Sequence, residues 1–579
     1  MKMENTADRE HNYKPNFGKA VSVEAPLNAV RQYLGDFDAN KEWNRNRPGE
    51  QYDANIKFLI IDAYKRFIEE DSLILVGRTG TGKTAILNRY MYDVLNGKIK
   101  NIKSVLKLDL KQYIMQLAKY GEVNGRASFA QNEIENNIEM IVNLAIMQNI
   151  VKYHNHSTDQ IEKMAKYLNS EKITRNTNLL SQYINELGKI FEESNFGKII
   201  STVGVLAKFA QKYQTAEYEE AVEALHVYLD MNSDFLVLID SMDEYDRDTS
   251  SVLVVKALIE SCYKFYNENI NCHIQLKIAL PAEIYSDIVV SLPEKHQSNT
   301  IFIEWKYRDL VKMIAIRTLY YGNHSENSQI SKLSNGYVYS DFYEDYEKSK
   351  EYLNTFLPLQ IPTNLSMCFD SIAYCIRHTQ KKPRQAMRVF NAIIDVIERK
   401  ADPKYFYSHS SELSHCVHMV QNDMLKDALS MYKTQTDNSI FAICDKVLMN
   451  REAVIDSKKM MDYIKEASSI YRKINLSDSE VLAILVESGI LGKRKVEEYI
   501  EPNNNFFKND KTIKIIKTLF EYQIKDRLRF ARGDKYVIHP MCYEHFTNLV
   551  DRNAMIYPEP IDDDEDVMND WLRDKTEII

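Results

Sequence analysis

Eight consecutive residues carry the clearest chemical pattern in the chain. They are Gly77-Arg78-Thr79-Gly80-Thr81-Gly82-Lys83-Thr84, and they fit the G-x-x-x-x-G-K-[ST] spacing of a phosphate-binding loop. The chain has only 17 glycines in 579 residues, so three of them within this stretch call for a backbone or ligand explanation. In such a loop Lys83 would reach the β- and γ-phosphates of a nucleotide, and the Thr84 hydroxyl would bind Mg²⁺.

The flanking residues supply the structural context that this pattern requires. The run from Leu73 to Val76 predicts a buried strand, and the run from Ala85 to Tyr92 predicts a helix. Unpaired main-chain N–H groups at a helix start attract phosphate. These arguments favour a phosphate loop over a glycine turn with a chance lysine. The expected nucleotide-binding residues here are Gly77, Arg78, Thr79, Gly80, Thr81, Gly82, Lys83, Thr84 and Ala85.

A second group of candidate residues follows the apolar run Phe235 to Ile239. We expect Asp240, at the end of this strand, to hold Mg²⁺ opposite Thr84. Asp243 and Glu244 are candidates to orient or deprotonate the attacking water, with Asp243 slightly favoured. Taken alone, the segment is equally well explained as a solvated acidic turn; its pairing with the glycine loop favours catalysis, with Lys83, Asp243 and Glu244 as catalytic residues.

These residues need a sheet to position them. Further strands are predicted at 104–110, 274–280 and 300–305, and helices at 53–70 and 250–268. Alternating strands and helices predict a parallel sheet covered on both faces, with the ligand at the carboxyl ends of the strands. The segment from about 116 to 229 is polar, periodic and poor in glycine, which indicates a helical insertion. The fold class expected is therefore α/β.

The length predicts several domains. We expect an irregular N-terminal segment with a short helix at 25–34, a P-loop ATPase core, a helical lid domain, a winged-helix domain and an acidic tail. The expected boundaries are 1–50, 51–305, 306–475, 476–550 and 551–579.

The predicted winged helix comprises helices at 478–488, 493–500 and 511–522, followed by a hairpin with a turn at 532–534. If it bound DNA, the third helix would enter a groove, and four lysines would contact phosphates. A protein-interaction or autoinhibitory role for this module is somewhat favoured. The four lysines are Lys508, Lys511, Lys514 and Lys517.

Composition limits the partners and the compartment. The formal charge of −9 argues against non-specific coating of nucleic acid, although a local basic face remains compatible with DNA binding. The N-terminus lacks an apolar signal core, and no apolar stretch is long enough to span a bilayer. The seven cysteines are scattered without metal-ligand spacing. We therefore expect a cytoplasmic protein with no membrane partner and no zinc site.

Several segments together resemble STAND-class P-loop ATPases and their AAA+ relatives over roughly residues 50 to 400. The segment FLVLIDSMDEYD is similar to their hhhhD-G-h-D-E signature, IEWKYRDLVKMIAIR to their W-x-x-x-x-L segment, and KKPRQAMRVF to their P-R-x-x element. The resemblance implies that Arg384 contacts the nucleotide from the lid; a solvated helix face is the alternative. Ser241 stands where the family has glycine, and Pro281-Ala282-Glu283 departs from the usual polar sensor, so Glu283 is only a candidate.

The resemblance also implies a function. The first expectation is a regulatory ATPase switch in a bacterial defence (antiviral) or mobile-element system, using ATP and Mg²⁺, with a homo-oligomer or an effector protein as partner. The alternative is a DNA-handling, origin-recognition-like ATPase that binds duplex DNA through the winged helix. A scaffold that binds ATP and barely hydrolyses it is disfavoured by the carboxylate pair. Arg317 is a surface charge or, less favoured, an arginine finger.

Overall fold

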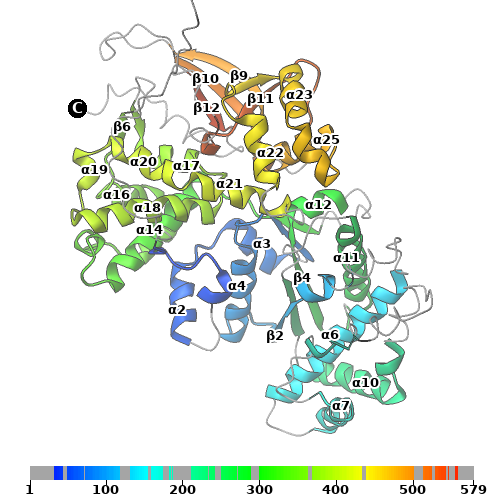
Figure 1. Cartoon of the computed structure of the whole chain (residues 1–579). Helices are drawn as coiled ribbons and strands as arrows, with labels where there is room; N and C mark the ends of the chain where they lie inside the picture. The colour runs from blue at the N-terminus through cyan, green and yellow to red at the C-terminus, as the bar shows by residue number, and fades with distance from the viewer. Residues whose placement is uncertain are drawn as a thin grey trace, which may run out of the picture.

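The architecture is that of a computed structural model of the whole chain (Figure 1). The residues that it describes are 31–43, 48–70, 72–115, 117, 131–153, 158–173, 181–183, 185–186, 189, 210–232, 234–240, 249–269, 271–288, 299–362, 368–432, 439–500, 513–523, 528–542, 546 and 554–558.

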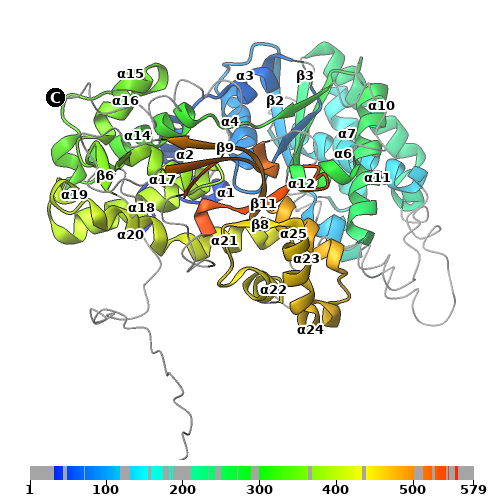
Figure 2. The same cartoon turned by 90° about the horizontal axis from the view of Figure 1, so that it is seen from above.

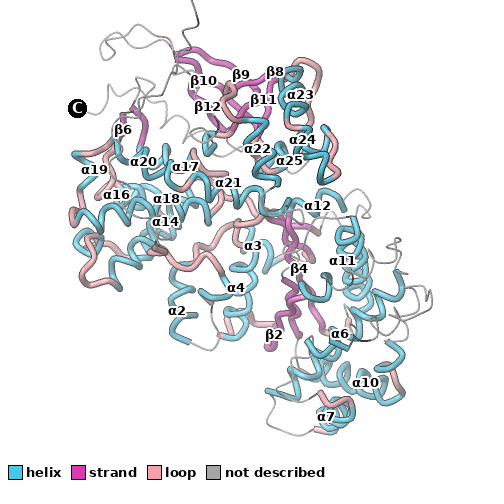
Figure 3. The backbone as a smooth tube through the Cα atoms, viewed as in Figure 1, coloured by secondary structure: helices cyan, strands magenta, loops and turns pink. Residues whose placement is uncertain are grey.

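A five-stranded parallel sheet forms the centre of the α/β region (Figure 3). The strands are β1 (Ile74–Gly77), β2 (Ile102–Asp109), β3 (Asp234–Asp240), β4 (Ile274–Pro281) and β5 (Thr300–Phe302). They lie in the order β2-β3-β4-β1-β5, and every pair is parallel. Side chains of β1 and β3 are almost entirely buried, as expected for strands covered on both faces. The predicted α/β class with a parallel sheet is confirmed.

Helices pack against this sheet and position its ends. The helices are α3 (Asp62–Glu69), α4 (Lys83–Leu95), α11 (Thr249–Asn269) and α12 (Ala282–Ile288). Helix α4 contacts four of the five strands, whereas α11 packs on β4 and α12. Since β1 leads through the glycine-rich loop into α4, the loop lies at the carboxyl edge of the sheet.

The chain between β2 and β3 forms a helical lobe beyond α11 (Figure 1). Its described helices are α6 (Gln131–Tyr153), α7 (Asp159–Ser170) and α10 (Ala216–Met231). Helix α6 packs on α11 and α7, and α7 packs on α10. The described helices therefore agree with the helical insertion predicted at about 116–229.

The described residues of the N-terminal segment, 31–43 and 48–50, include helical structure that was not predicted. Two helices precede the core, α1 (Ala39–Glu42) and α2 (Pro48–Lys57). Leu34 and Trp43 are buried in the main hydrophobic core, and residues 31–34 are not helical. The single helix predicted at 53–70 is wrong, because the chain between Phe58 and Ile61 is extended and separates α2 from α3. The other residues of the helix predicted at 25–34 lie outside the described residues.

A helical region follows β5, as predicted. Its elements are α14 (Tyr307–His324), η3 (Ile330–Leu333), α15 (Tyr339–Glu344), α16 (Tyr346–Leu353), β6 (Gln360–Pro362), β7 (Cys368–Asp370), α17 (Ser371–Arg377), α18 (Pro383–Lys400), α19 (Tyr405–Ser408), α20 (Ser411–Met419), α21 (Gln421–Leu429) and η4 (Ser430–Tyr432). Helices α14 and α18 contact each other, and both are buried along much of their length. Figure 2 shows this region beside the sheet, on the side away from the helical lobe.

The C-terminal region combines helices with a second five-stranded sheet. Its elements are α22 (Ser439–Leu448), β8 (Val454–Asp456), α23 (Ser457–Glu466), α24 (Ser468–Tyr471), η5 (Arg472–Ile474), α25 (Asp478–Glu487), β9 (Leu491–Ile500), β10 (Ile513–Leu519), η6 (Glu521–Gln523), β11 (Lys535–Ile538), η7 (Pro540–Cys542) and β12 (Ala554–Pro558). The strand order is β12-β10-β9-β11-β8.

Two of the three helices predicted here are wrong. The segment 493–500 belongs to β9, and 511–522 contains β10, which pairs antiparallel with β9. The helix predicted at 478–488 is confirmed as α25, and its start is fixed by a capping box between Ser477 and Glu480. Since β8 pairs with β11, the boundary predicted at residue 476 separates β8 from its own sheet.

Candidate nucleotide-binding site

The three glycines of the loop each meet a specific backbone requirement. Gly80 and Gly82 have φ values of 85° and 95°, in the left-handed region that side chains disfavour. Gly77 has a different constraint, because a Cβ atom there would lie 2.5 Å from the Thr81 hydroxyl and 2.8 Å from Ile303. The turn and the close packing therefore explain the unusual glycine density.

Lys83 opens helix α4 and is buried. Its ammonium donates to the main-chain oxygen of Gly77 at 3.0 Å, so the side chain folds back over the loop. The helix N-cap is Gly82, which has no side-chain oxygen to cap the first-turn N–H groups. Such a helix start offers its donors and its positive dipole to an anion.

Thr84 and Asp240 meet across 156 residues of sequence. The Thr84 hydroxyl donates to Asp240 Oδ1 at 3.2 Å, although β1 and β3 are separated by β4 in the sheet. Both groups are hard oxygen donors of the type that Mg²⁺ prefers, and a single carboxylate with a hydroxyl leaves room for phosphate oxygens and waters. The residues present therefore fit the expected magnesium site.

Lys107 is a site residue that the sequence reasoning missed. It projects from β2, and its ammonium lies 2.8 Å from Asp240 Oδ2 and also donates to Asn88 and Asn40. Asp240 is only 2% exposed, so this cation compensates a buried carboxylate. No pattern in the sequence of β2 marks this lysine, because the strand contains other polar residues, and its partner could not be deduced from spacing.

The predicted water-activating residues Asp243 and Glu244 lie outside the described residues, as does Ser241.

The helical region contacts the loop at two described points. The main-chain N of Arg384, in the first turn of α18, lies 3.5 Å from the Gly80 oxygen, and Arg384 Cβ lies beside Gly80. Trp305, which follows β5, donates its indole N–H to the Thr81 oxygen at 2.8 Å. The segments that carry the family resemblance therefore flank the phosphate loop, and Arg384 lies at the loop instead of on a solvated face.

The C-terminal region also reaches the loop. The Arg78 guanidinium donates to the Glu487 main-chain oxygen at 2.6 Å, at the last residue of α25. One residue further on, the Ser488 oxygen accepts from Gln380 at 2.7 Å. A cation at a helix C-terminus is favourable because the last carbonyls carry partial negative charge.

Two buried ionisable groups lie near these contacts. Lys382, the N-cap residue of α18, is 5% exposed, and burial lowers its pKa to about 7, with Glu283 opposing this effect and Arg78 adding to it. Glu283 is buried in the first turn of α12, directly after the strand end where a polar sensor was sought. Its part in nucleotide sensing stays a prediction.

Arg317 is neither a surface charge nor an exposed finger. It is buried, and it pairs with Glu42 Oε1 at 2.9 Å, while Lys57 binds the same carboxylate at 2.7 Å. Burial favours the neutral carboxyl, but Arg317 and Lys57 outweigh it and lower the pKa of Glu42. The group ties the N-terminal segment to α14.

Two of the four lysines expected to contact DNA lie on a strand instead of a helix. Lys514 and Lys517 belong to strand β10, while Lys508 and Lys511 lie outside the described residues. The recognition helix predicted at 511–522 is therefore absent, because its β-branched residues pair with β9 instead.

Within the described residues, no helix has both the length and the apolar character needed to cross a membrane.

The chain was compared with protein-family models and with curated proteins. No family model matches the chain, and no curated protein matches it either.

Proposed function

We propose that this protein is a magnesium-dependent ATPase that acts as a regulatory switch, in which the bound nucleotide sets conformation or oligomeric state. The observation that carries the proposal is the 3.2 Å contact between Thr84 and Asp240 beside a glycine loop with Lys83 at its end. A hydroxyl and a carboxylate brought together at this point have the arrangement that a metal-bound triphosphate requires.

The chain's own groups account for binding. Main-chain N–H groups of the loop and of the α4 N-terminus would hold the phosphates, and the Lys83 ammonium would exchange its carbonyl contacts for phosphate oxygens. Thr84 and Asp240 would hold Mg²⁺, which would neutralise charge on the phosphates. Asp243 or Glu244 would orient the water and accept its proton.

The coupling to conformation rests on contacts to the loop from two other regions. Arg384 approaches Gly80 from α18, and Arg78 reaches α25 in the C-terminal region. A ligand that shifts this loop must therefore also shift the groups that touch it. The lid and winged-helix roles of these regions belong to this proposal, and a second copy of the chain or an effector protein would receive the signal.

The DNA-handling alternative has lost its main structural argument, since the helix placed in the groove is a strand. The resemblance to STAND-class ATPases suggests a bacterial defence or mobile-element system as the setting.

Size-exclusion chromatography with light scattering tests the switch. Mass and elution are compared with ATP, with ADP and without nucleotide for the wild type, Lys83→Ala and Asp243→Ala, with exposed Lys65→Ala as the control. The wild type and the control should differ between ATP and ADP. Lys83→Ala should not respond, and Asp243→Ala should persist in the ATP form. Identical behaviour of all four proteins in every nucleotide state contradicts the switch.

A further inference from the structure

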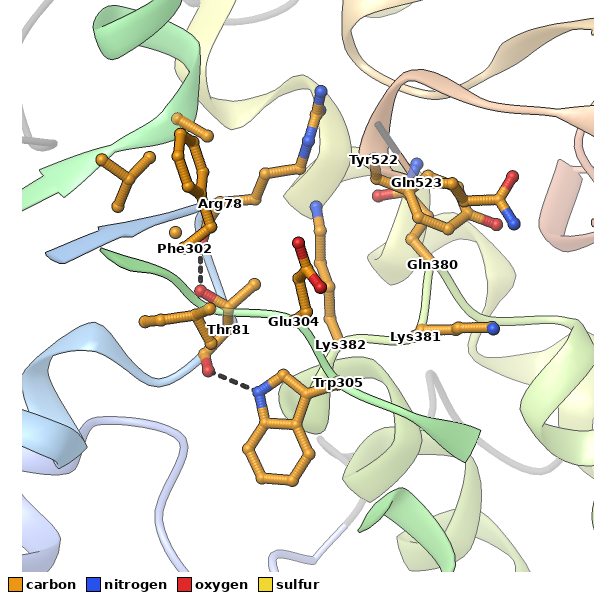
Figure 4. Close-up of a pocket in the computed structure, with 14 residues that line it drawn as sticks. Arg78, Thr81, Phe302, Glu304, Trp305, Gln380, Lys381, Lys382, Tyr522 and Gln523 are labelled. Atoms are coloured by element: carbon orange, nitrogen blue, oxygen red, sulfur yellow. Dashed lines mark hydrogen bonds between the residues drawn. The ribbon is translucent and has the colours of Figure 1, made fainter. Parts of the chain in front are cut away.

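A cavity lies against the glycine-rich loop (Figure 4). Its volume is about 70 Å³, several times the roughly 10–15 Å³ that one ordered water requires and far below the roughly 300 Å³ of a small-molecule pocket. It therefore has room for a small ion and excludes a nucleoside. The loop, the chain after β5, the residues before α18 and η6 of the C-terminal region all line it.

The cavity is distinct from the predicted triphosphate cradle. Gly77, Arg78 and Thr81 line it, but Lys83, Thr84 and Asp240 do not. It lies on the β5 side of the loop, where Ile303 packs against Gly77, whereas Thr84 and Asp240 meet on the β3 side. A molecule bound in this cavity would therefore contact the loop from the side of β5.

Three of the residues that line it are cationic, in an otherwise largely apolar lining. Lys382 projects into the space toward Arg78, as Figure 4 shows, whereas the Lys381 side chain points away from both. Lys382 is 5% exposed, and its ammonium group has no hydrogen-bond or ion-pair partner in the part of the chain that the structure describes; Glu283 acts on it through its charge alone. The only acidic residue among the described lining residues is Glu304, at the exposed rim. A buried ammonium without a partner is costly, and an anion would relieve that cost.

The α18 N-terminus adds positive potential on the same side. Lys382 is its N-cap, with no side-chain capping hydrogen bond, and Pro383 occupies the first helical position. The helix has 18 residues, long enough for its dipole to favour an anion at this end. Gln380, Tyr522 and Gln523 add uncharged polar groups to this lining.

We propose that this cavity binds inorganic phosphate, held by Lys382 and Arg78 between the loop, the helical region and the C-terminal region. Arg78 already bonds the end of α25, and Gln380 bonds the following residue. A phosphate here would fasten all three regions together. The proposal does not require that the loop binds ATP.

Titration calorimetry of the full chain with inorganic phosphate at constant ionic strength tests this site. We expect Lys382→Met to weaken phosphate binding at least about tenfold, since a charge-assisted contact is lost. Lys400→Met, at the exposed far end of the same helix, should bind like the wild type. Saturating ADP should leave phosphate affinity unchanged, which separates free phosphate from a nucleotide's own phosphate.

Glu304→Gln keeps the test decisive if Lys382→Met misfolds. The substitution removes the rim carboxylate at an exposed position, so phosphate affinity should rise. The proposal is overturned if the wild type does not bind phosphate, if ADP abolishes binding, if Lys382→Met binds normally, or if Glu304→Gln fails to strengthen binding.

Discussion

Arg78 in the phosphate loop and Glu487 at the end of α25 are joined by a 2.6 Å hydrogen bond across 409 residues of sequence. The guanidinium neutralises the negative end of a helix dipole at a partly buried contact. Arg78 therefore belongs to the loop and also contacts the C-terminal region. Its replacement should weaken the contact between these two parts of the chain.

Arg78→Gln should reduce the protection of the α25 C-terminus against amide hydrogen exchange. Losing a hydrogen bond from a charged donor costs about 1.5–3 kcal/mol, so local opening near 485–489 should become roughly tenfold or more frequent. Arg66→Gln, at an exposed ion pair on α3, serves as the control. Equal exchange in both variants would show that the Arg78 contact does not hold the regions together.

Lys107 and Asp240 should be energetically coupled. The double-mutant cycle of Lys107→Met and Asp240→Asn, measured by chemical unfolding, should give a coupling of about 1–3 kcal/mol because the pair is buried at 2.8 Å. A coupling near zero would mean that Asn40 and Asn88 alone satisfy the lysine.

Arg317→Met should destabilise the fold without impairing turnover. Removing one partner of a buried ion pair costs about 3–5 kcal/mol, since Glu42 keeps only Lys57. Chemical unfolding measures that loss, and ATP turnover per folded molecule should stay at the wild-type value. Intact stability with lost turnover would restore an arginine-finger role.

Acid sensitivity should depend partly on His539. Burial, with the charges of Lys382 and Arg377, lowers its pKa from 6.5 to about 3, and the Met541 N–H donates to its Nδ1, which favours the neutral ring. Between these pH values the unfolded chain binds a proton that the folded chain does not. This histidine therefore makes the free energy of unfolding fall by about 1.4 kcal/mol per pH unit on acidification.

His539→Gln should remove that contribution, since the amide oxygen can still accept from Met541. Urea unfolding at pH 7, 6, 5 and 4 measures the slope of stability against pH. An unchanged slope would assign the acid sensitivity to other buried groups, such as His378, whose pKa burial also lowers.

Local patterns predicted the glycine-rich loop and the parallel sheet because the conformation of each of these elements is determined by residues close together in the sequence. Glycines at Gly80 and Gly82 have the positive φ that the motif requires, and β3 is a continuous apolar run. Long-range pairing defeated the same reasoning further on: β10 has apolar residues at helical spacing, but its isoleucines and threonine favour a strand once β9 is available.

The partners of buried charged residues also could not be predicted from the sequence. The partner of Arg317 stands 275 residues away, and Lys107 finds Asp240 only through the strand order. Spacing within a sequence segment carries no information on such contacts. Lys382 stands among charged neighbours in the sequence, a pattern typical of a solvated face, yet it is buried at the junction of three regions.

The most direct test of the nucleotide site is the equilibrium affinity for ATP, measured by titration calorimetry with and without Mg²⁺. The wild type and Lys65→Ala should bind ATP, and Mg²⁺ should strengthen that binding; Lys83→Ala should lose at least about tenfold in affinity, and Thr84→Ala should lose the Mg²⁺ effect. Wild-type affinity in Lys83→Ala, or an Mg²⁺ effect that survives in Thr84→Ala, would contradict the account.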